Sequence, residues 1–374
     1  MVANKTVSVG VVGTSWWVDT MYLPALQAHP NARVVAICGR NAENAQKMAD
    51  RWQIPQVYTD YNAMINKENL DAIIVSTIND AHYPITLAAL NAELHVLCEK
   101  PLSLTYSQAQ EMADLAEKKG VIHMVPFTYS FMPTARYLKE LIDDGYIGKP
   151  YHLNLRYYAD YGREAGDYRW RYDVSKAGTG VLGDLGTHFL YLARWYYGEI
   201  TSVCVQLGHM VPRAEVDMEG NPYEVTDDAA TIMLTFENGA QGVIQVSCLC
   251  HEGTAFGQTH HMDFHGSDGT LYSFTDWDTV QRVSGARTME GVPKELPIPD
   301  HIWGQARRDT VHNTYRDVFR KHDFMTRNFI TGIVEGKPVS PDFHDGARIQ
   351  RIVEAMIRSH HERRWVDVHN ILPV

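Results

Sequence analysis

The stretch Val7-Ser8-Val9-Gly10-Val11-Val12-Gly13 sets the class of fold that the rest of the chain has to complete. Its valines are typical of a buried β-strand, and the glycine at its end suits a tight turn. The apolar residues that follow are spaced as in a helix. A strand, a glycine turn and a helix form the context in which a dinucleotide pyrophosphate meets a helix N-terminus. The residues expected at this turn are Gly13, Thr14, Ser15, Trp16 and Trp17.

The glycine pattern at this turn is incomplete. When G-x-G-x-x-G is aligned from Gly13, serine and valine stand at Ser15 and Val18 in place of the second and third glycines. The tight-turn glycine is the one that remains. The motif alone therefore leaves two interpretations open, a dinucleotide site and a plain turn from strand to helix.

The second strand carries a clue to the nucleotide. Residues Ala32–Cys38 read as a strand, and Gly39 and Arg40 follow it. An acidic residue here usually holds the ribose hydroxyls of NAD, whereas an arginine suits the 2′-phosphate of NADP. Arg40 thus favours NADP(H) modestly. The alternative is a surface arginine beside Asn41, which is placed to cap the next helix.

Strands and helices then alternate as far as residue 128. Such alternation predicts a doubly wound parallel sheet with its ligand crevice at the carboxyl ends of the strands. We expect a dinucleotide-binding domain over residues 1–128 and further strands at Leu70–Ser76, His95–Cys98 and Val121–Val125, with a helix at 106–119. The residues that fall at the carboxyl edge include Gly13, Arg40, Asn79 and Lys100.

The strand His95–Cys98 delivers Glu99, Lys100 and Pro101 to this edge. Proline has no N–H for a sheet ladder, so the strand ends there and Lys100 follows at its carboxyl end. A lysine in that place is able to contact substrate or cofactor. The alternative is an ordinary exposed lysine.

From Tyr129 the pattern changes to strand candidates separated by turn signals, as at Glu237-Asn238-Gly239 and Ser267-Asp268-Gly269. Neighbouring strands joined by short turns predict a largely antiparallel sheet. We therefore expect an α+β domain over residues 129–374 with a large open, mainly antiparallel sheet, for substrate binding and oligomerisation. The strand candidates are 151–158, 201–208, 229–236, 240–249, 261–266 and 270–274.

One apolar helix, 177–195, interrupts these strands and carries Asp184 and His188. Four residues apart on a helix, the two side chains share a face. They are either a core histidine with an acidic neighbour or a pair that lines a cleft. Glycines at 178, 180, 183 and 186 favour the cleft, because glycine weakens a helix and suits close approach of a backbone or ligand.

Composition excludes several classes of function. The 374 residues carry a formal net charge of −11 and contain no Lys/Arg-rich run, which argues against nucleic-acid binding. No apolar run is long enough to cross a membrane, so we expect no membrane partner and a cytoplasmic location. The five cysteines are scattered and odd in number, and the histidines lack zinc spacing, so neither a disulfide framework nor a metal site is expected.

Two motifs, Glu99-Lys100-Pro101 and Gly183-Asp184-x-Gly186-x-His188, together resemble the Gfo/Idh/MocA family of oxidoreductases over nearly the whole chain. The resemblance implies a Rossmann domain for NAD(P), and Lys100, Asp184 and His188 as active-site residues beside the nicotinamide. It also implies assembly into a homodimer or homotetramer through the C-terminal sheet. The residues it implies at the cofactor, with the turn residues named above, are Gly39, Arg40, Thr77, Asn79, His82, Glu99 and Lys100.

The chain departs from the family pattern in places. Thr77-Ile78-Asn79-Asp80-Ala81-His82 resembles the family's T-P-N-x-x-H segment with isoleucine for proline, and Thr128 and Ser130 stand where members often have Asn and Arg. Substrate contacts at the last two positions therefore do not carry over.

The aromatic and basic segment, residues 157–172, precedes the helix and suggests the class of substrate. Aromatic rings beside charged donors suit a sugar, and arginines suit an anionic substituent such as a carboxylate, sulfonate or phosphate. The alternative is a loop packed by its own aromatic rings with exposed arginines. The substrate-binding candidates are Lys100, Tyr129, Arg163, Arg169, Trp170, Arg171, Asp184 and His188.

These observations predict an enzyme that transfers a hydride between NAD(P) and a secondary alcohol or ketone of a sugar, cyclitol or glycoside. His188 would be the general acid/base, Lys100 would stabilise the alkoxide, and Asp184 would orient His188 or hold a substrate hydroxyl. Two alternatives remain. One is a glycosidase that oxidises, eliminates and re-reduces with its cofactor recycled, and the other is a cofactor-binding sensor without catalysis.

Overall fold

The computed structural model describes residues 5–251 and 253–373 and divides into two compact units. The first consists of Met1–Pro126 and Arg316–Arg348, and the second of Phe127–Tyr315 and Ile349–Val374. The division expected from the sequence at residue 128 differs from this one, because the chain returns to the first unit. Phe319 explains the return: its buried ring packs edge-on against Trp17 and Tyr22.

The first unit is built on a six-stranded sheet with the order β3-β2-β1-β4-β5-β6. Every pairing within it is parallel, as the alternation of strands and helices predicts. The valines of β1 are buried because helices cover both faces of the sheet. The strands are β1 Val7–Val12, β2 Ala32–Cys38, β3 Gln56–Tyr58, β4 Ala72–Val75, β5 His95–Cys98 and β6 His123–Met124.

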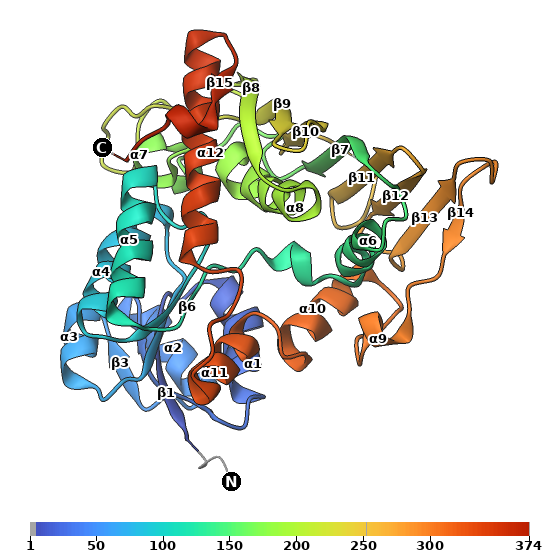
Figure 1. Cartoon of the computed structure of the whole chain (residues 1–374). Helices are drawn as coiled ribbons and strands as arrows, with labels where there is room; N and C mark the ends of the chain where they lie inside the picture. Colours follow the sequence, from blue (N-terminus) through green and yellow to red (C-terminus); the bar gives the residue numbers. More distant parts are fainter. Residues whose placement is uncertain (1–4, 252, 374) are drawn as a thin grey trace. The chain divides into compact units, whose positions relative to one another are not determined.

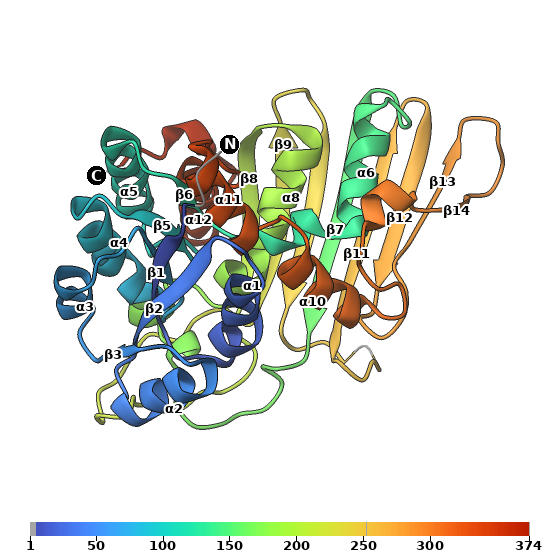
Figure 2. The same cartoon turned by 90° about the horizontal axis from the view of Figure 1, so that it is seen from below.

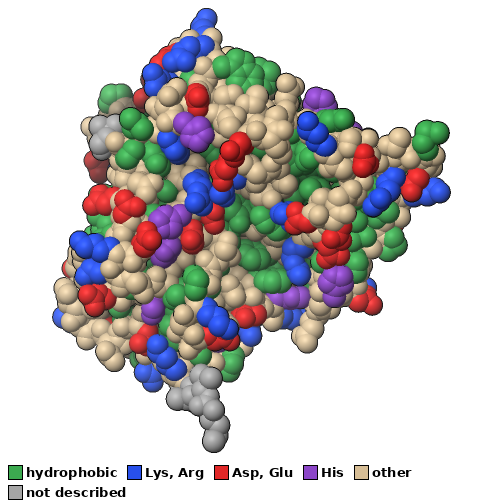
Figure 3. Space-filling model, in the orientation of Figure 1, with side chains coloured by type: hydrophobic (Ala, Val, Ile, Leu, Met, Phe, Trp, Pro, Cys, Tyr) green, Lys and Arg blue, Asp and Glu red, His purple; other side chains and the backbone are tan. Residues whose placement is uncertain are grey.

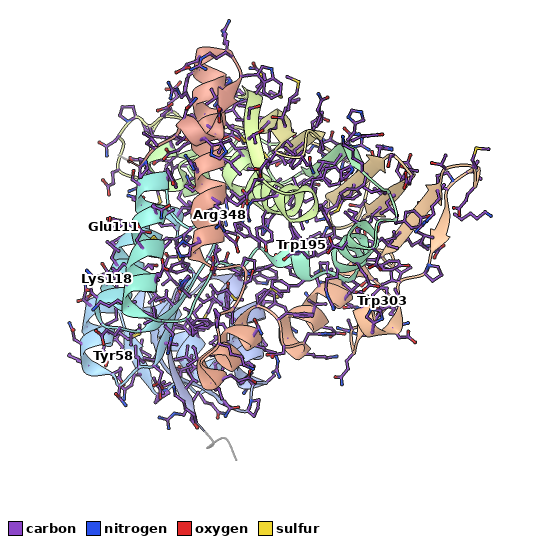
Figure 4. The ribbon with its side chains drawn as sticks, in the orientation of Figure 1. Tyr58, Glu111, Lys118, Trp195, Trp303 and Arg348 are labelled. Atoms are coloured by element: carbon purple, nitrogen blue, oxygen red, sulfur yellow. The ribbon has the colours of Figure 1, made fainter. Side chains whose placement is uncertain are left out.

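Helices α3, α4 and α5 lie on one face of this sheet and α1, α2 and α11 on the other (Figure 2). Local signals set their ends. Thr105 caps α5, and Gly120 ends it in the left-handed conformation. Glu111 and Lys118 lie on the exposed side of α5 (Figure 4). The helices are α1 Leu23–Gln27, α2 Ala42–Trp52, α3 Tyr61–Lys67, α4 His82–Asn91, α5 Tyr106–Lys119 and α11 Thr326–Glu335, with a π-helix η1 Val18–Tyr22 and a 3-10 turn η2 Asn79–Ala81.

The second unit contains a nine-stranded sheet with the order β14-β13-β12-β11-β7-β10-β9-β8-β15. Its pairings are antiparallel except that of β7 with β10. The mainly antiparallel sheet is thereby confirmed, with β13, β14 and β15 as strands that the sequence patterns missed. The strands are β7 Pro150–Ala159, β8 Ile200–Gly208, β9 Ala229–Phe236, β10 Gln241–Ser247, β11 Gln258–Gly266, β12 Gly269–Thr275, β13 Arg282–Arg287, β14 Lys294–Leu296 and β15 Val366–Asp367.

Helices α6 and α8 pack on one face of this sheet (Figures 1 and 2). Residues on the other face remain exposed and include Met233, Val243 and Phe274. This alternation of buried and exposed residues along the strands follows from the two-residue period of a strand. The remaining helices are α6 Pro133–Asp143, α7 Val174–Ala177, η5 Leu182–Gly186 (a π-helix), α8 Thr187–Tyr197, α9 Asp300–Trp303, α10 Val311–Lys321 and α12 Phe343–Glu362, with 3-10 turns at Thr128–Phe131, Trp170–Tyr172 and Val368–Asn370.

Lysine and arginine side chains are interspersed with aspartate and glutamate on the face drawn in Figure 3. Among the residues that the structure describes, no helix has both the length and the apolar character to cross a membrane. Within the same residues, no group of three or more His, Cys, Asp or Glu side chains is arranged to hold a metal ion.

Candidate functional site

The turn after β1 is closed by backbone contacts that a side chain at Gly13 would disrupt. Gly13 has a φ of +127°, and a Cβ atom there would lie 2.0 Å from the carbonyl oxygen of Ser76. Its N–H donates to the carbonyl of Cys38 at 2.9 Å. Gly39 is equally confined, since its Cβ would lie 2.5 Å from the Cγ2 atom of Thr14. The glycine turn therefore lies where β1, β2 and β4 end, which fits the approach of a dinucleotide to bare backbone.

The chain beyond this turn is π-helical where the glycine pattern fails. The third glycine position holds Val18, which is fully buried and begins η1. Ser15, at the second position, accepts a hydrogen bond from the N–H of Val18. Trp16 is 62% exposed beside the turn. Ser15 and Val18 thus stabilise the start of η1. Alignment with the G-x-G-x-x-G pattern did not predict this local role.

Glu99 ties the turn to the catalytic-lysine candidate. Its side chain is buried, and Oε1 accepts hydrogen bonds from Trp17 Nε1 at 2.8 Å and from the Tyr22 hydroxyl at 2.5 Å. Burial raises the pKa of Glu99, while Lys100, Tyr22 and Trp17 act to lower it. Glu99 and Trp17, both expected at the cofactor, are therefore bonded to each other.

Lys100 is half-buried at the end of β5, and a side chain of α4 contacts the backbone that follows it. The fully buried His82 lies 2.8 Å through Nδ1 from the carbonyl oxygen of Pro101. Burial lowers the pKa of His82 to about 4, so the ring is neutral at physiological pH and donates from Nδ1. His82, expected at the cofactor, thus contacts the backbone beside Lys100. The other edge candidates divide by exposure: Asn79 is buried in η2, Thr77 is half-buried and Arg40 is exposed at the end of β2.

In the second unit, Asp184 and His188 lie on consecutive but different helical segments. Asp184 belongs to the π-helix η5, and His188 is the second residue of α8. The sequence predicted one continuous helix over 177–195; instead α7 ends at Ala177 and η5 begins at Leu182. The Thr187 hydroxyl donates to the carbonyl of Gly183 at 2.7 Å where the two segments join.

Aromatic rings enclose His188, which is 6% exposed. The ring of Tyr129 lies 4.6 Å from the His188 ring between centroids, and that of Phe127 lies 6.3 Å away. The Tyr129 hydroxyl shares a hydrogen bond of 2.7 Å with the Tyr157 hydroxyl and accepts one from Gln258. Burial raises the pKa of Tyr129 to about 12, so its hydroxyl keeps its proton. Tyr129, predicted to bind substrate, therefore presents its ring to His188 while its hydroxyl is bonded within the unit.

A buried histidine extends this cluster. The His260 ring lies 4.7 Å from Tyr129 and 4.3 Å from Tyr157, and burial lowers its pKa to about 3. The sequence analysis did not single out His260. The sequence does not show which of the histidines in this strand faces inward, because that depends on the register of β11 in the sheet.

Asp184 is held by two residues of the aromatic and basic segment. The Tyr161 hydroxyl donates to Oδ2 of Asp184 at 2.9 Å, and Arg171 Nε lies 4.0 Å from the same oxygen. Arg171 stacks over Trp170 with its guanidinium 4.4 Å from the ring centre. Of the predicted substrate-binding arginines, Arg171 thus lies beside Asp184. All three arginines, Arg163, Arg169 and Arg171, are exposed.

Both halves of the chain match models of one protein family. Residues 7–127 match "Oxidoreductase family, NAD-binding Rossmann fold", and residues 139–368 match "Oxidoreductase family, C-terminal alpha/beta domain". The chain belongs to the Gfo/Idh/MocA oxidoreductase family. The family predicted from the Glu99-Lys100-Pro101 and Gly183–His188 motifs is therefore confirmed. The fold class predicted from the order of strands, helices and turns is confirmed as well, and the first unit is of the NAD-binding type.

Individual members of the Gfo/Idh/MocA family are similar along most of the chain. A levoglucosan dehydrogenase of Pseudarthrobacter phenanthrenivorans is 28% identical over 94% of this chain and 93% of its own. A myo-inositol 2-dehydrogenase of Thermotoga maritima is 24% identical over 97% of this chain and 99% of its own. A levoglucosan dehydrogenase solved in complex with NADH and levoglucosan superposes with a TM-score of 0.83 at 25% identity, covering 97% of this chain and all of the other. These relatives are dehydrogenases of sugars and cyclitols.

Proposed function

We propose that this chain is an NAD(P)-dependent dehydrogenase that oxidises a secondary alcohol of a sugar, cyclitol or glycoside, or reduces the corresponding ketone. The observation that carries the proposal is the position of Asp184 and His188, four residues apart where η5 meets α8, with the ring of Tyr129 against the histidine. Family membership and the sugar and cyclitol dehydrogenases among its relatives support the substrate class.

The proposed cofactor site follows the carboxyl edge of the parallel sheet. The backbone at Gly13 and Gly39 would face the pyrophosphate, and Arg40 would contact a 2′-phosphate, which favours NADP(H). A similar dehydrogenase binds NADH, so Arg40 is the residue on which the choice between the two nucleotides turns. The bound nicotinamide supplies the hydride acceptor, and the protein supplies position and electrostatics.

The chemistry assigned to the side chains follows from their types. Oxidation of an alcohol requires the hydroxyl proton to leave, and the imidazole of His188 is suited to take it. The ammonium of Lys100 would stabilise the negative charge that develops on that oxygen. Asp184, with Tyr161 and Arg171 at its Oδ2, would hold a neighbouring substrate hydroxyl or orient His188.

Arg171 refines the proposal for the substrate. Its guanidinium lies beside the carboxylate of Asp184, which already balances its positive charge. The presence of Arg171 therefore does not require an anionic substrate, and a neutral sugar is equally compatible with it. Replacing Arg163, Arg169 and Arg171 by alanine one at a time separates the cases. An anionic substrate predicts a rise in KM for at least Arg171→Ala, and unchanged KM in all three removes these arginines from substrate binding.

We also propose that copies of the chain assemble through the exposed face of the nine-stranded sheet, where Met233, Val243 and Phe274 lie. A charged substitution such as Val243→Glu would then lower the molar mass in solution. An unchanged mass would move the interface elsewhere.

The test of function is a panel of sugars, cyclitols and glycosides supplied with NAD⁺ or NADP⁺. The proposal predicts stoichiometric accumulation of reduced cofactor with at least one of them, and none for His188→Asn. Release of an aglycone with catalytic cofactor and no net reduction would instead identify the recycling glycosidase. Nucleotide binding without either reaction would favour the sensor.

A further inference from the structure

The contact between Tyr161 and Asp184 depends on the conformation of the turn over residues 160–164, which carries Tyr161. Tyr161 follows β7 and is 41% exposed, yet its hydroxyl reaches Oδ2 of Asp184 at 2.9 Å. An exposed ring has freedom to leave such a position unless its backbone is fixed. The origin of that fixation is a buried ion pair behind the turn.

Arg213 holds the turn over residues 160–164. Its Nη2 donates to the carbonyl of Gly162 at 2.9 Å, and its Nη1 donates to the carbonyl of Glu164 at 3.1 Å. The guanidinium also forms an ion pair with Asp228, and both side chains are 1% exposed. A guanidinium donates to two carbonyls and a carboxylate from two separate nitrogens in a fixed fork, whereas the donors of an ammonium all lie on one nitrogen.

The turn fits against this anchor without spare room. A Cβ atom at Gly162 would lie 2.3 Å from Cys248 Sγ and 3.3 Å from Arg213 Nη2. The N–H of Gly162 donates to the carbonyl of Cys248 at 2.9 Å. The ring of Tyr172 lies 3.9 Å below the guanidinium and completes its surroundings. Movement of Arg213 would therefore move the backbone that carries Tyr161.

Asp228 and its neighbour Asp227 link the two sides of the contact. Oδ2 of Asp228 accepts from the N–H groups of Met210 and Val211 at 2.9 and 3.0 Å, so the anchor's own partner is fixed. The carboxylate of Asp227 accepts from the N–H groups of Gly180 and Leu182, each at 2.7 Å, where η5 begins. Adjacent residues thus hold the turn that bears Tyr161 and the helix that bears Asp184.

We propose that Arg213, paired with Asp228, is a positioning residue: it fixes the 160–164 turn so that the Tyr161 hydroxyl holds the Asp184 carboxylate in its working orientation. The inference rests on the proposed function for the statement that Asp184 meets substrate. A buried ion pair is costly to desolvate and is therefore weak evidence for stability, so the contacts of Arg213 with the turn carry the inference.

The test reads the Tyr161 hydroxyl directly and needs no substrate. Desolvation and the nearby Asp184 carboxylate raise the pKa of Tyr161 well above the ordinary value. The protein labelled with 3-fluorotyrosine gives a ¹⁹F resonance for Tyr161, assigned by its loss in Tyr161→Phe. We expect its titration to move to lower pH in Asp184→Asn and in Arg213→Lys, because both changes remove the carboxylate from the hydroxyl. The other titratable or charged groups that act on Tyr161 or Asp184, namely Arg171, Cys248, Tyr129 and Tyr157, are not substituted in Arg213→Lys.

Tyr168 provides the internal control, because its hydroxyl donates to Asp173 rather than to Asp184. Its resonance is expected to keep its titration in Asp184→Asn. If Arg213→Lys does not fold, Asp228→Asn removes the charge of the same pair and is expected to give the same shift. A Tyr161 titration in either folded variant equal to that of the wild type would overturn the inference.

Kinetics then test the link to catalysis. Tyr161→Phe is expected to lower kcat about tenfold or more, as loss of a hydrogen bond to a charged group does. Because Arg213 acts through Tyr161, Tyr161→Phe/Arg213→Lys should lose no more than Tyr161→Phe alone. Additive losses would contradict the inference. A wild-type protein without turnover would refute the proposed function instead, and the ¹⁹F result would stand apart from it.

Discussion

His82→Asn tests whether the loop that carries Lys100 is held by a buried neutral imidazole. The ring is fully buried and Nδ1 meets the Pro101 carbonyl at 2.8 Å. Asparagine keeps an N–H donor near the position of Nδ1 and cannot take up a proton in this range. The variant therefore removes the titration while it preserves the contact as far as a side chain allows.

The magnitude follows from the lowered pKa of His82, about 4 against an ordinary value of 6.5. In the unfolded chain the imidazole becomes protonated near its ordinary pKa of 6.5, whereas in the folded protein it stays neutral until the pH approaches about 4. Stability from this group is therefore present above pH 6.5 and lost as the pH falls toward 4. Because one pH unit of difference is worth about 1.4 kcal/mol, the loss reaches about 2.5 kcal/mol at pH 4.5.

The assay is urea unfolding of wild type and His82→Asn at pH 7.5 and 4.5. The advantage of the wild type over the variant should shrink by about 2.5 kcal/mol on acidification. Thr86→Val, another buried position of α4 with no titrating group, is the control and should change stability equally at both pH values. The same pH dependence in wild type and His82→Asn would refute the reasoning, because the imidazole would then titrate alike in both states.

Three further substitutions test the two parts of the proposed site. His188→Ala should lower kcat/KM by about 100-fold or more through loss of the acid/base, and a loss below tenfold would remove that role from His188. Arg40→Ala should weaken NADP binding about tenfold or more, measured by fluorescence quenching, and leave NAD binding unchanged; an equal effect on both nucleotides, or none, would exclude a phosphate contact. Gly13→Ala should destabilise the protein by about 1–3 kcal/mol because of its backbone conformation alone, and by more because the new Cβ would lie 2.0 Å from the Ser76 carbonyl oxygen. If the variant unfolds in urea like the wild type and binds cofactor with the same affinity, the geometry of the turn is contradicted.

Local signals allowed much of the fold to be predicted from the sequence. The strand His95–Cys98 and the helix Tyr106–Lys119 have the predicted bounds, because Pro101 ends the strand, Thr105 caps the helix and Gly120 closes it. The family was recognisable for a similar reason, since its two motifs are short and contiguous. The return of residues 316–348 to the first unit was not predictable, because it depends on the packing of Phe319 against the rings of Trp17 and Tyr22, about 300 residues earlier in the chain.

The candidate site was predictable in its residues but not in its connections. Asp184 and His188 were evident from spacing, whereas the π-helix that carries Asp184 depends on contacts of Gly180 and Leu182 with Asp227, far along the chain. Tyr161 lay within the segment predicted to meet substrate, but its bond to Asp184 needs the turn that Arg213 holds. Glu99 likewise accepts hydrogen bonds from Trp17 and Tyr22, which are 82 and 77 residues away in the sequence. Spacing along the sequence does not predict contacts over such separations.

The most direct test of the central claim follows the transferred hydrogen. A substrate from the panel, deuterated at the carbinol carbon, is incubated with the enzyme and oxidised cofactor, and the mass of the reduced cofactor is measured. The account predicts one deuterium in the reduced nicotinamide for each ketone formed, and neither product with His188→Asn. Ketone formation with no deuterium in the cofactor, or equal transfer in the His188 variant, would contradict the proposed function.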